Sequence, residues 1–349
     1  MIFVANQIIL MVETIVCFNL KKNGKKIFAI ISFLQLFVLL GCRGLTVGID
    51  TSTYISLFRV LCAGGNVIQL EILNRIMMLG VSRLPIENQE TVLLCLYAAI
   101  TLIAFYIFIY SESYDVYLSV CIFTGMMYYY FSFNAMRQAL AMAIVSIAIS
   151  KLNKEKSLSF LVLVIIASGF HTSALVALPL WIVKKISLKY SWKLYMIFVV
   201  ASASMVVIGR EVVELLLVFF PSYRGYINSV FAEEGNYLNP LMYLAVLTIV
   251  TIIWNSTKKN SEDNLYLVML GVGTVIYFMS IQVGIVNRIV YYYTMSIIVI
   301  LPNLFKRIPK IKNRVPLSVG AHLMVLIYSG LLVMREAHGI VPYSFFWQM

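Results

Sequence analysis

The sequence predicts an all-α, polytopic integral membrane protein that forms a single transmembrane domain over residues 1–349. Of its residues 61% are hydrophobic and only 12% are charged, and the apolar residues come in long blocks. A soluble domain carries about twice that charge, and many of the blocks approach the roughly 20 residues that a helix needs to cross a bilayer. Continuous apolar blocks favour helices over the alternating pattern of a membrane β-barrel.

Breaks between the apolar blocks predict about twelve transmembrane helices. They lie near residues 1–18, 27–42, 91–110, 116–133, 135–150, 157–170, 172–183, 194–209, 240–254, 265–284, 289–305 and 317–334. Pro179 and Lys184 keep the seventh block short, so half of a broken or re-entrant element is the alternative there. The first block follows no basic leader and shows no small-residue cleavage site, and we therefore expect a retained span.

The lysines predict the orientation of these spans. They all lie in alternate loops, at residues 21–26, 151–156, 184–193, 258–259 and 306–314. Because positive charge is retained on the cytoplasmic side, these loops are expected inside and both termini outside. Two long outer loops follow, at about 43–90 and 210–239. The first contains two stretches, Tyr54–Cys62 and Val67–Leu79, that suit amphipathic helices on the membrane, and we interpret the second as a lid.

The outer side carries arginine as its only cation. These residues are Arg43, Arg59, Arg75, Arg83, Arg137, Arg210, Arg224, Arg288 and Arg335. Topology requires only positive charge inside and does not explain this preference. A planar guanidinium grips phosphates and carboxylates through two parallel hydrogen bonds, so the set predicts an anionic substrate. Solvation or headgroup binding is the alternative for Arg75, Arg83, Arg224 and Arg335.

The charge pattern also excludes several classes of function. The net charge of +12 is distributed over loops and span ends, which argues against nucleic acid as a partner. The cytoplasmic loops are short and hold no glycine-rich phosphate loop, so use of ATP or a nucleotide-sugar is not expected. The outer side shows no Asp-x-Asp pair and no histidine cluster with metal-ligand spacing. We therefore expect neither a metal nor a cofactor.

Two polar segments near span ends are the first candidates for a site. In the 43–54 segment, Arg43, Asp50 and Tyr54 accompany two glycines that permit a tight backbone; a surface salt bridge between Arg43 and Asp50 is the alternative. In the 134–138 segment, Asn134, Arg137 and Gln138 interrupt apolar runs. Such groups are costly near hydrocarbon unless they face a wet or protein-lined cavity, although a lone arginine can also snorkel to the interface.

Two further segments add a histidine and a third arginine. His171 and Ser173 follow a span in the 169–173 segment, and a histidine is the side chain best suited to exchange a proton near neutral pH. Helix capping by Thr172 or Ser173, with His171 merely interfacial, is the alternative. Asn287 and Arg288 belong to the 284–288 segment.

Tyrosine trios at 128–130 and 291–293 flank the second and fourth of these segments. They fit the interfacial aromatic belt or stacking against sugar rings.

These residue types together fit a membrane-embedded substrate that carries a pyrophosphate and a sugar. Fixed guanidinium groups would stabilise the charge that develops on a leaving pyrophosphate, and a base would activate a sugar hydroxyl, with inversion at the anomeric carbon. We predict His171, Asp50 and Arg137 as catalytic residues, with Glu71 as an alternative base. The predicted substrate-binding residues are Arg43, Tyr54, Asn134, Gln138, Ser173, Asn287 and Arg288.

The chain resembles the EpsG family of bacterial polysaccharide polymerases, which is akin to the Wzy-type O-antigen and capsule polymerases. The resemblance rests on Arg43 with Gly48-Ile49-Asp50 and Tyr54, Asn134-x-x-Arg137-Gln138-x-x-Ala141, Phe170-His171-x-Ser173-Ala174-Leu175 followed by Pro179, and Asn287-Arg288. It implies a glycosyltransferase of exopolysaccharide biosynthesis that joins undecaprenyl-pyrophosphate-linked oligosaccharide repeat units at the outer face of the bacterial cytoplasmic (inner) membrane. It also implies a fold similar to the membrane part of C-type glycosyltransferases.

The resemblance implies functions for Arg43, Asp50, Arg137, Gln138, His171 and Arg288. The expected partners are the lipid-linked donor and acceptor and the bilayer, with a chain-length regulator as a further candidate. A flippase of lipid-linked sugars is an alternative, although it needs polar groups along a path through the membrane and often shows repeats. A membrane O-acyltransferase is another, but it would place its histidine near a cytoplasmic acyl donor.

Overall fold

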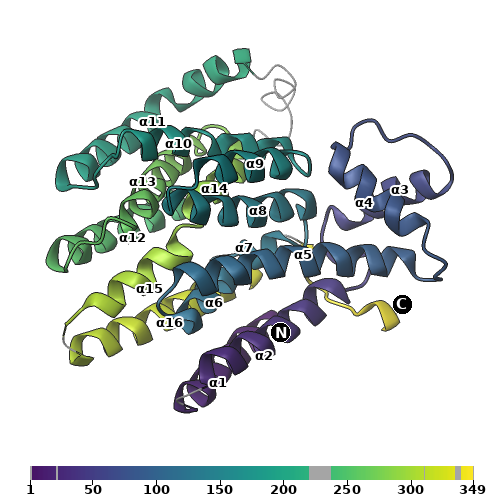
Figure 1. Ribbon diagram of the computed structural model, residues 1–349, viewed down its shortest axis with the longest axis horizontal. Coiled ribbons are helices and arrows are strands. Elements are labelled where there is room, and N and C mark those ends of the chain that lie inside the picture. Colours follow the sequence, from purple (N-terminus) through teal and green to yellow (C-terminus); the bar gives the residue numbers. More distant parts are fainter. Residues whose placement is uncertain (1, 21–22, 220–236, 310, 335–338, 349) are drawn as a thin grey trace. The chain divides into compact units, whose positions relative to one another are not determined.

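The computed structural model describes residues 2–20, 23–219, 237–309, 311–334 and 339–348. Within these ranges the chain forms helices and no β-strand, apart from one isolated antiparallel bridge between Arg43 and Phe345 (Figure 1). The prediction of an all-α protein is confirmed. Contacts divide the chain into two compact units, Met1–Leu175 with Val315–Met349, and Val176–Arg314. Each unit is described by itself.

The first unit contains three of the four predicted site segments and most of the chain. Its helices are α1 (Ile2–Asn19), α2 (Gly24–Gly41), α3 (Thr51–Cys62), α4 (Ile72–Ser82), α5 (Gln89–Glu112), α6 (Val116–Gly125), α7 (Tyr128–Phe131), α8 (Met136–Asn153), α9 (Ser157–Ser168) and most of α16 (Ile311–Met334). The 3-10 helix η1 (Thr172–Ala177) crosses into the second unit. That unit holds α10 (Pro179–Lys185), α11 (Trp192–Phe219), α12 (Leu238–Ser256), α13 (Asp263–Met279), η4 (Gly284–Val286), α14 (Asn287–Thr294) and α15 (Ile297–Arg307).

Among the described residues, five helices are long and apolar enough to cross a membrane, namely α1, α2, α5, α11 and α12. A sixth span results if the pair 284–294 and 297–307, bent by 43°, counts as one. The structure thus supports a membrane protein, while the count of twelve spans and the likeness to C-type glycosyltransferases stay predictions.

Several predicted spans are interrupted. The block at 116–133 divides into α6 and α7 at Met127, whose φ of 69° is left-handed. The block at 172–183 divides into η1 and α10, with Pro179 at the first turn of α10, as the alternative for this block anticipated.

The two ends of α5 carry different cations, which agrees with the predicted segregation of arginine from lysine. Near its start, Glu90 pairs with Arg59 at 2.5 Å, and at its end Glu112 pairs with Lys154 at 2.6 Å. With 24 residues, α5 is about 36 Å long at 1.5 Å per residue. Arginine and lysine therefore lie at opposite ends of a segment long enough to span the hydrocarbon core.

The first tyrosine trio is part of the core of the first unit. Tyr128, Tyr129 and Tyr130 are fully buried. The hydroxyl of Tyr129 donates to Leu36 O at 2.8 Å, and that of Tyr130 accepts from Asn6 at 3.2 Å. Both interpretations of this trio, the interfacial belt and sugar stacking, are therefore wrong, because the rings pack against neighbouring helices and their hydroxyls are satisfied inside the protein.

The first predicted outer loop forms helices, as its two amphipathic stretches predict. α3 and α4 bury one face each, through residues such as Phe58 and Met78, in a cluster that also includes Leu94 of α5 and Leu140 of α8. They are thus folded onto the helices of the first unit. The second predicted outer loop begins inside α11, which continues to Phe219. Its residues 220–236, with Arg224, lie outside the described residues, as does Arg335.

Candidate active site

The 43–54 segment packs against the junction of α7 and α8. Gly48 has φ of 93°, and a Cβ there would lie 2.4 Å from Phe133 O, so only glycine permits this approach. Phe133 O also accepts a hydrogen bond from Thr51 Oγ1 at 3.2 Å. The structure therefore joins two of the predicted site segments, 43–54 and 134–138, through one backbone carbonyl.

Arg43 is buried within this junction, with 1% of its surface exposed. Its guanidinium donates to Leu40 O and, at 3.4 Å, to Phe133 O, and it contacts Met136 Sδ at 2.9 Å. Burial lowers the pKa of Arg43 to about 10, which still leaves the group charged at neutral pH. Because the guanidinium is buried and donates to two backbone carbonyls, a substrate contact of Arg43 stays a prediction.

Asp50, a predicted catalytic residue, lies partly exposed at the N-terminus of α3. No ion pair joins it to Arg43, and both residues belong to the described part of the chain. The surface salt bridge between them, the alternative interpretation of the segment, is therefore wrong. A catalytic role for Asp50 stays a prediction.

Arg137 lies in the first turn of α8 and forms an ion pair with Glu71, the residue that precedes α4. The side chains of Arg137 and Glu71 are 21% and 13% exposed, so both are within reach of a bound molecule. The guanidinium carbon of Arg137 also lies 5.4 Å from the centre of the Tyr54 ring, a cation–π distance. Tyr54 and Arg137, predicted separately, are therefore neighbours.

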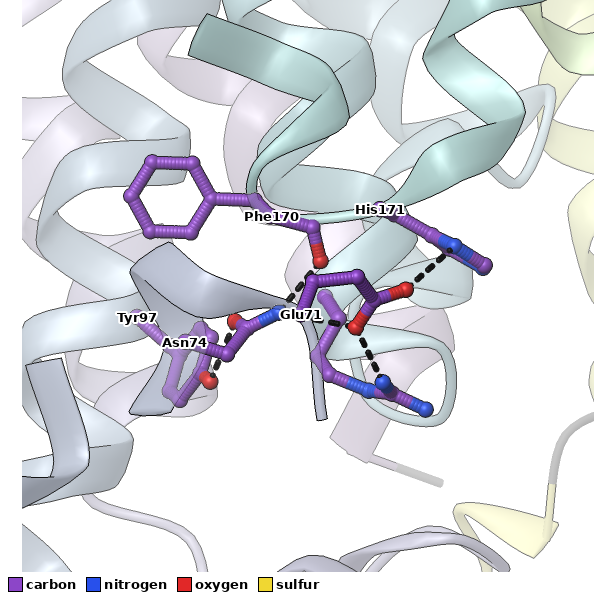
Figure 2. A network of polar contacts seen from close by, with 6 residues as sticks. Glu71, Asn74, Tyr97, Phe170 and His171 are labelled. Atoms are coloured by element: carbon purple, nitrogen blue, oxygen red, sulfur yellow. Dashed lines mark hydrogen bonds and ion pairs between the residues drawn. The ribbon is translucent and has the colours of Figure 1, made fainter. Parts of the chain in front are cut away.

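His171 meets the other oxygen of the same carboxylate. Its Nδ1 atom lies 3.1 Å from Glu71 Oε1, and its side chain is 20% exposed (Figure 2). The backbone turn after α9 positions the ring, because the amide of His171 donates to Ala167 O at 2.9 Å. Ser173 follows, partly exposed, in η1. Glu71 thus bridges the predicted catalytic residues Arg137 and His171.

Asn74 supports the Glu71 carboxylate from within the protein. Its Nδ2 atom donates to Glu71 Oε2 at 3.2 Å and to Phe170 O, while its Oδ1 accepts from the Tyr97 hydroxyl at 2.8 Å (Figure 2). Asn74 is fully buried. It therefore ties α4 to α5 and to the turn that carries His171. We call Glu71, Asn74, Tyr97, Arg137 and His171 the Glu71 cluster.

The charges around Glu71 determine its protonation state. Burial by itself raises the pKa of Glu71, but the hydrogen bond with His171 and the charge of Arg137 outweigh it and lower the pKa to about 2. Glu71 is therefore an anion at neutral pH and a poor acceptor for a catalytic proton. At Nδ1 of His171 the Glu71 carboxylate is instead placed to orient the imidazole.

Of the remaining predicted residues, two are buried in the first unit and two belong to the second unit. Asn134 and Gln138 are buried. Asn287 and Arg288 begin α14 in the second unit, where Asn287 Oδ1 accepts from Ser280 Oγ at 2.7 Å. Substrate binding by these four residues stays a prediction.

Sequence reasoning missed Asn74 and Tyr97 and gave Glu71 only a secondary place. A helical spacing of three residues puts Glu71 and Asn74 on one face at the start of α4, but this signal is common. Among the described residues no group of three or more His, Cys, Asp or Glu side chains is arranged to hold a metal ion.

Comparison with known protein families decides the identity. The model of the EpsG family matches residues 26–345, nearly the whole chain and every segment of the site. The chain belongs to the EpsG family. Membership of the EpsG family implies a membrane protein of the polysaccharide-polymerase type. A search of curated proteins and a search of solved structures found no match to this EpsG-family chain.

Proposed function

We propose that this EpsG-family protein is a glycosyltransferase that polymerises polyprenyl-pyrophosphate-linked oligosaccharide repeat units. The reaction takes place at the outer face of the bacterial cytoplasmic membrane and needs no metal. Family membership supports the polymerase class. The observation that carries the mechanism is the Glu71 carboxylate, which holds Arg137 by one oxygen and His171 by the other.

In the proposed step, His171 acts as the general base. With its Nδ1 facing Glu71, the neutral ring keeps its proton there, and Nε2 accepts the proton of the acceptor hydroxyl. The hydroxyl oxygen attacks the anomeric carbon of the donor and forms the new glycosidic bond. The bond from that carbon to the pyrophosphate oxygen breaks, and polyprenyl pyrophosphate leaves with the electron pair. Attack opposite the leaving group inverts the anomeric centre.

Arg137 stabilises the leaving group. Negative charge grows on the pyrophosphate as the bond breaks, and a fixed guanidinium is a preorganised partner for it. The Tyr54 ring and the Glu71 carboxylate hold this guanidinium on two sides. Because Arg137 supplies the positive charge that a divalent cation would otherwise provide, the step runs without added metal.

Reconstitution of the purified protein in liposomes with its lipid-linked repeat unit tests this function. We expect polymer in the presence of EDTA and without any nucleotide, and no polymer with the Arg137→Ala variant. Failure of the wild type to form polymer would contradict the proposal. Movement of the repeat unit across the bilayer without polymer would identify a flippase, and product formation only with an acyl donor would identify an acyltransferase.

A further inference from the structure

A cavity lies in the first unit, beside α3 and the start of α5. Its volume is about 600 Å³, and it is lined by residues that include Phe58, Arg59, Glu87, Asn88, Glu90 and Phe346. This volume lies within the range of small-molecule sites, roughly 300–1,000 Å³. No residue of the Glu71 cluster lines it. The cavity is therefore a separate feature of the fold.

The charges of the cavity argue against a phosphate ligand. Arg59 is the only cation among its lining residues, and Glu90 occupies its guanidinium in a two-point contact, Nε to Oε1 at 2.5 Å and Nη2 to Oε2 at 3.2 Å. Glu87 adds a second carboxylate. With one paired arginine against two glutamates, the lining carries a net charge of −1. It offers carboxylate and amide oxygens, which accept hydrogen bonds from hydroxyl groups.

An exposed aromatic platform adjoins this polar lining. The rings of Phe345 and Trp347 stack at 4.4 Å between centroids, and Trp347 is 57% exposed. Phe346, which lines the cavity, contacts the Trp347 ring edge-on at 5.0 Å. The amide of Phe346 donates to Cys42 O at 3.1 Å and so anchors the segment. An indole held in place in this way presents a rigid apolar face beside hydrogen-bonding groups.

The cavity begins one helical turn from the proposed reaction centre. Tyr54, whose ring contacts Arg137, and Phe58, which lines the cavity, are four residues apart in α3. They share one face of the helix, about 6 Å apart along its axis. A sugar chain with its reacting end at Arg137 and His171 would therefore reach the cavity within a few sugar residues.

We propose that this cavity is a binding subsite for uncharged sugar residues of the growing polysaccharide. Hydroxyl groups bind the carboxylates and amides of the lining, and a pyranose ring covers the face of Trp347. The proposal rests on the proposed function, because it names the substrate portion that the cavity holds. Retention of the chain at this subsite between additions favours long products.

Calorimetric titration of the detergent-purified protein tests the subsite directly. The probe is the set of oligosaccharides released from the cell's own polymer by partial acid hydrolysis, free of lipid and pyrophosphate. We expect Trp347→Ala to weaken binding at least tenfold and Trp347→Tyr to restore most of it. Trp192→Ala is the matched control, because it removes an indole that is 47% exposed at the start of α11 and should leave binding unchanged.

The outcomes separate this inference from the proposed function. Equal binding by the wild type and a folded Trp347→Ala variant, or no binding by the wild type, would overturn the subsite. If oligosaccharide binding depends on Trp347 but the wild type forms no polymer, the subsite is supported and the proposed polymerase function is contradicted. In an active preparation, we expect Trp347→Ala to shorten the polymer chains on a gel, and unchanged lengths would count against chain retention.

Discussion

Glu71, at the start of α4, pairs with Arg137, in the first turn of α8, across 66 positions of the sequence. The same carboxylate reaches His171 at 3.1 Å. The first predicted outer loop thus supplies the residue that joins the two catalytic candidates. Because one anion holds both a cation and an imidazole, the relative placement of these two groups depends on Glu71.

Replacement of Arg137 by lysine should abolish polymer while single lipid-linked repeat units accumulate. Lysine keeps the charge and can still pair with Glu71, but it lacks the planar fork and the contact over the Tyr54 ring. Polymer on a gel and lipid-linked repeats by mass spectrometry give the readout. Arg210→Lys is the matched control, since Arg210 forms an exposed pair with Glu214. Normal polymer from the Arg137→Lys variant would refute the need for a guanidinium.

His171→Ala should lower kcat by about 10²–10⁴-fold with little change in KM, the usual effect of removing a general base. Glu71→Gln should lower kcat in the same direction, because the imidazole loses the anion that orients it. Initial rates in the liposome assay measure both. His322→Ala is the control, since His322 contacts a backbone carbonyl within α16. Full turnover by His171→Ala would direct the search for the base to Asp50.

Glu71 should also make stability depend on acidity. The pKa of Glu71 is lowered from 4.5 to about 2. Its contribution to the free energy of unfolding is therefore complete above about pH 4.5 and is lost as the pH falls toward 2. At about 1.4 kcal/mol per pKa unit, the contribution is on the order of 3 kcal/mol. Thermal unfolding in detergent should give the wild type a clearly higher melting temperature than Glu71→Gln at pH 7. Below pH 4.5 the difference between the two melting temperatures should become smaller. A constant difference down to pH 2.5 would contradict this assignment.

Gly48→Ala should destabilise the first unit by about 2 kcal/mol or more. The left-handed φ of 93° strains any L-residue, and the new Cβ would lie 2.4 Å from the Phe133 carbonyl oxygen. Gly80→Ala is the control, because Gly80 lies within α4 with open space around it, and alanine is favoured in a helix. Melting temperatures in detergent compare the two, and equal values would argue against the close contact at Gly48.

Cys62 should report the side on which α3 lies. All five cysteines are free, and Cys62 is the exposed one. A membrane-impermeant maleimide should label it in intact cells, and Cys62→Ser should remove this label. Labelling of Cys62 only after the membrane is opened would place the first loop, and with it the Glu71 cluster, on the cytoplasmic side.

The sequence by itself determined the membrane character, the helical class and the family. Long apolar blocks indicate which segments transfer favourably into lipid, because the free energy of transfer depends mainly on the residues of the segment itself. The separation of lysine from arginine is equally visible in the sequence, and α5 shows it at its two ends. Arg137, His171 and Tyr54 were likewise identifiable, because polar residues beside apolar runs stand out.

Only the tertiary structure decided which of these residues meet. From the sequence, Arg137 was predicted as catalytic and Arg43 as substrate-binding, yet packing buries Arg43 against backbone carbonyls and leaves Arg137 partly exposed at Glu71. Packing also places Tyr128–Tyr130 in the core and not at the predicted membrane interface. The physical reason is that burial and ion pairing depend on partners far away in the chain, such as Glu71 at 66 positions from Arg137. Periodicity and composition describe each segment alone and carry no information on such a partner.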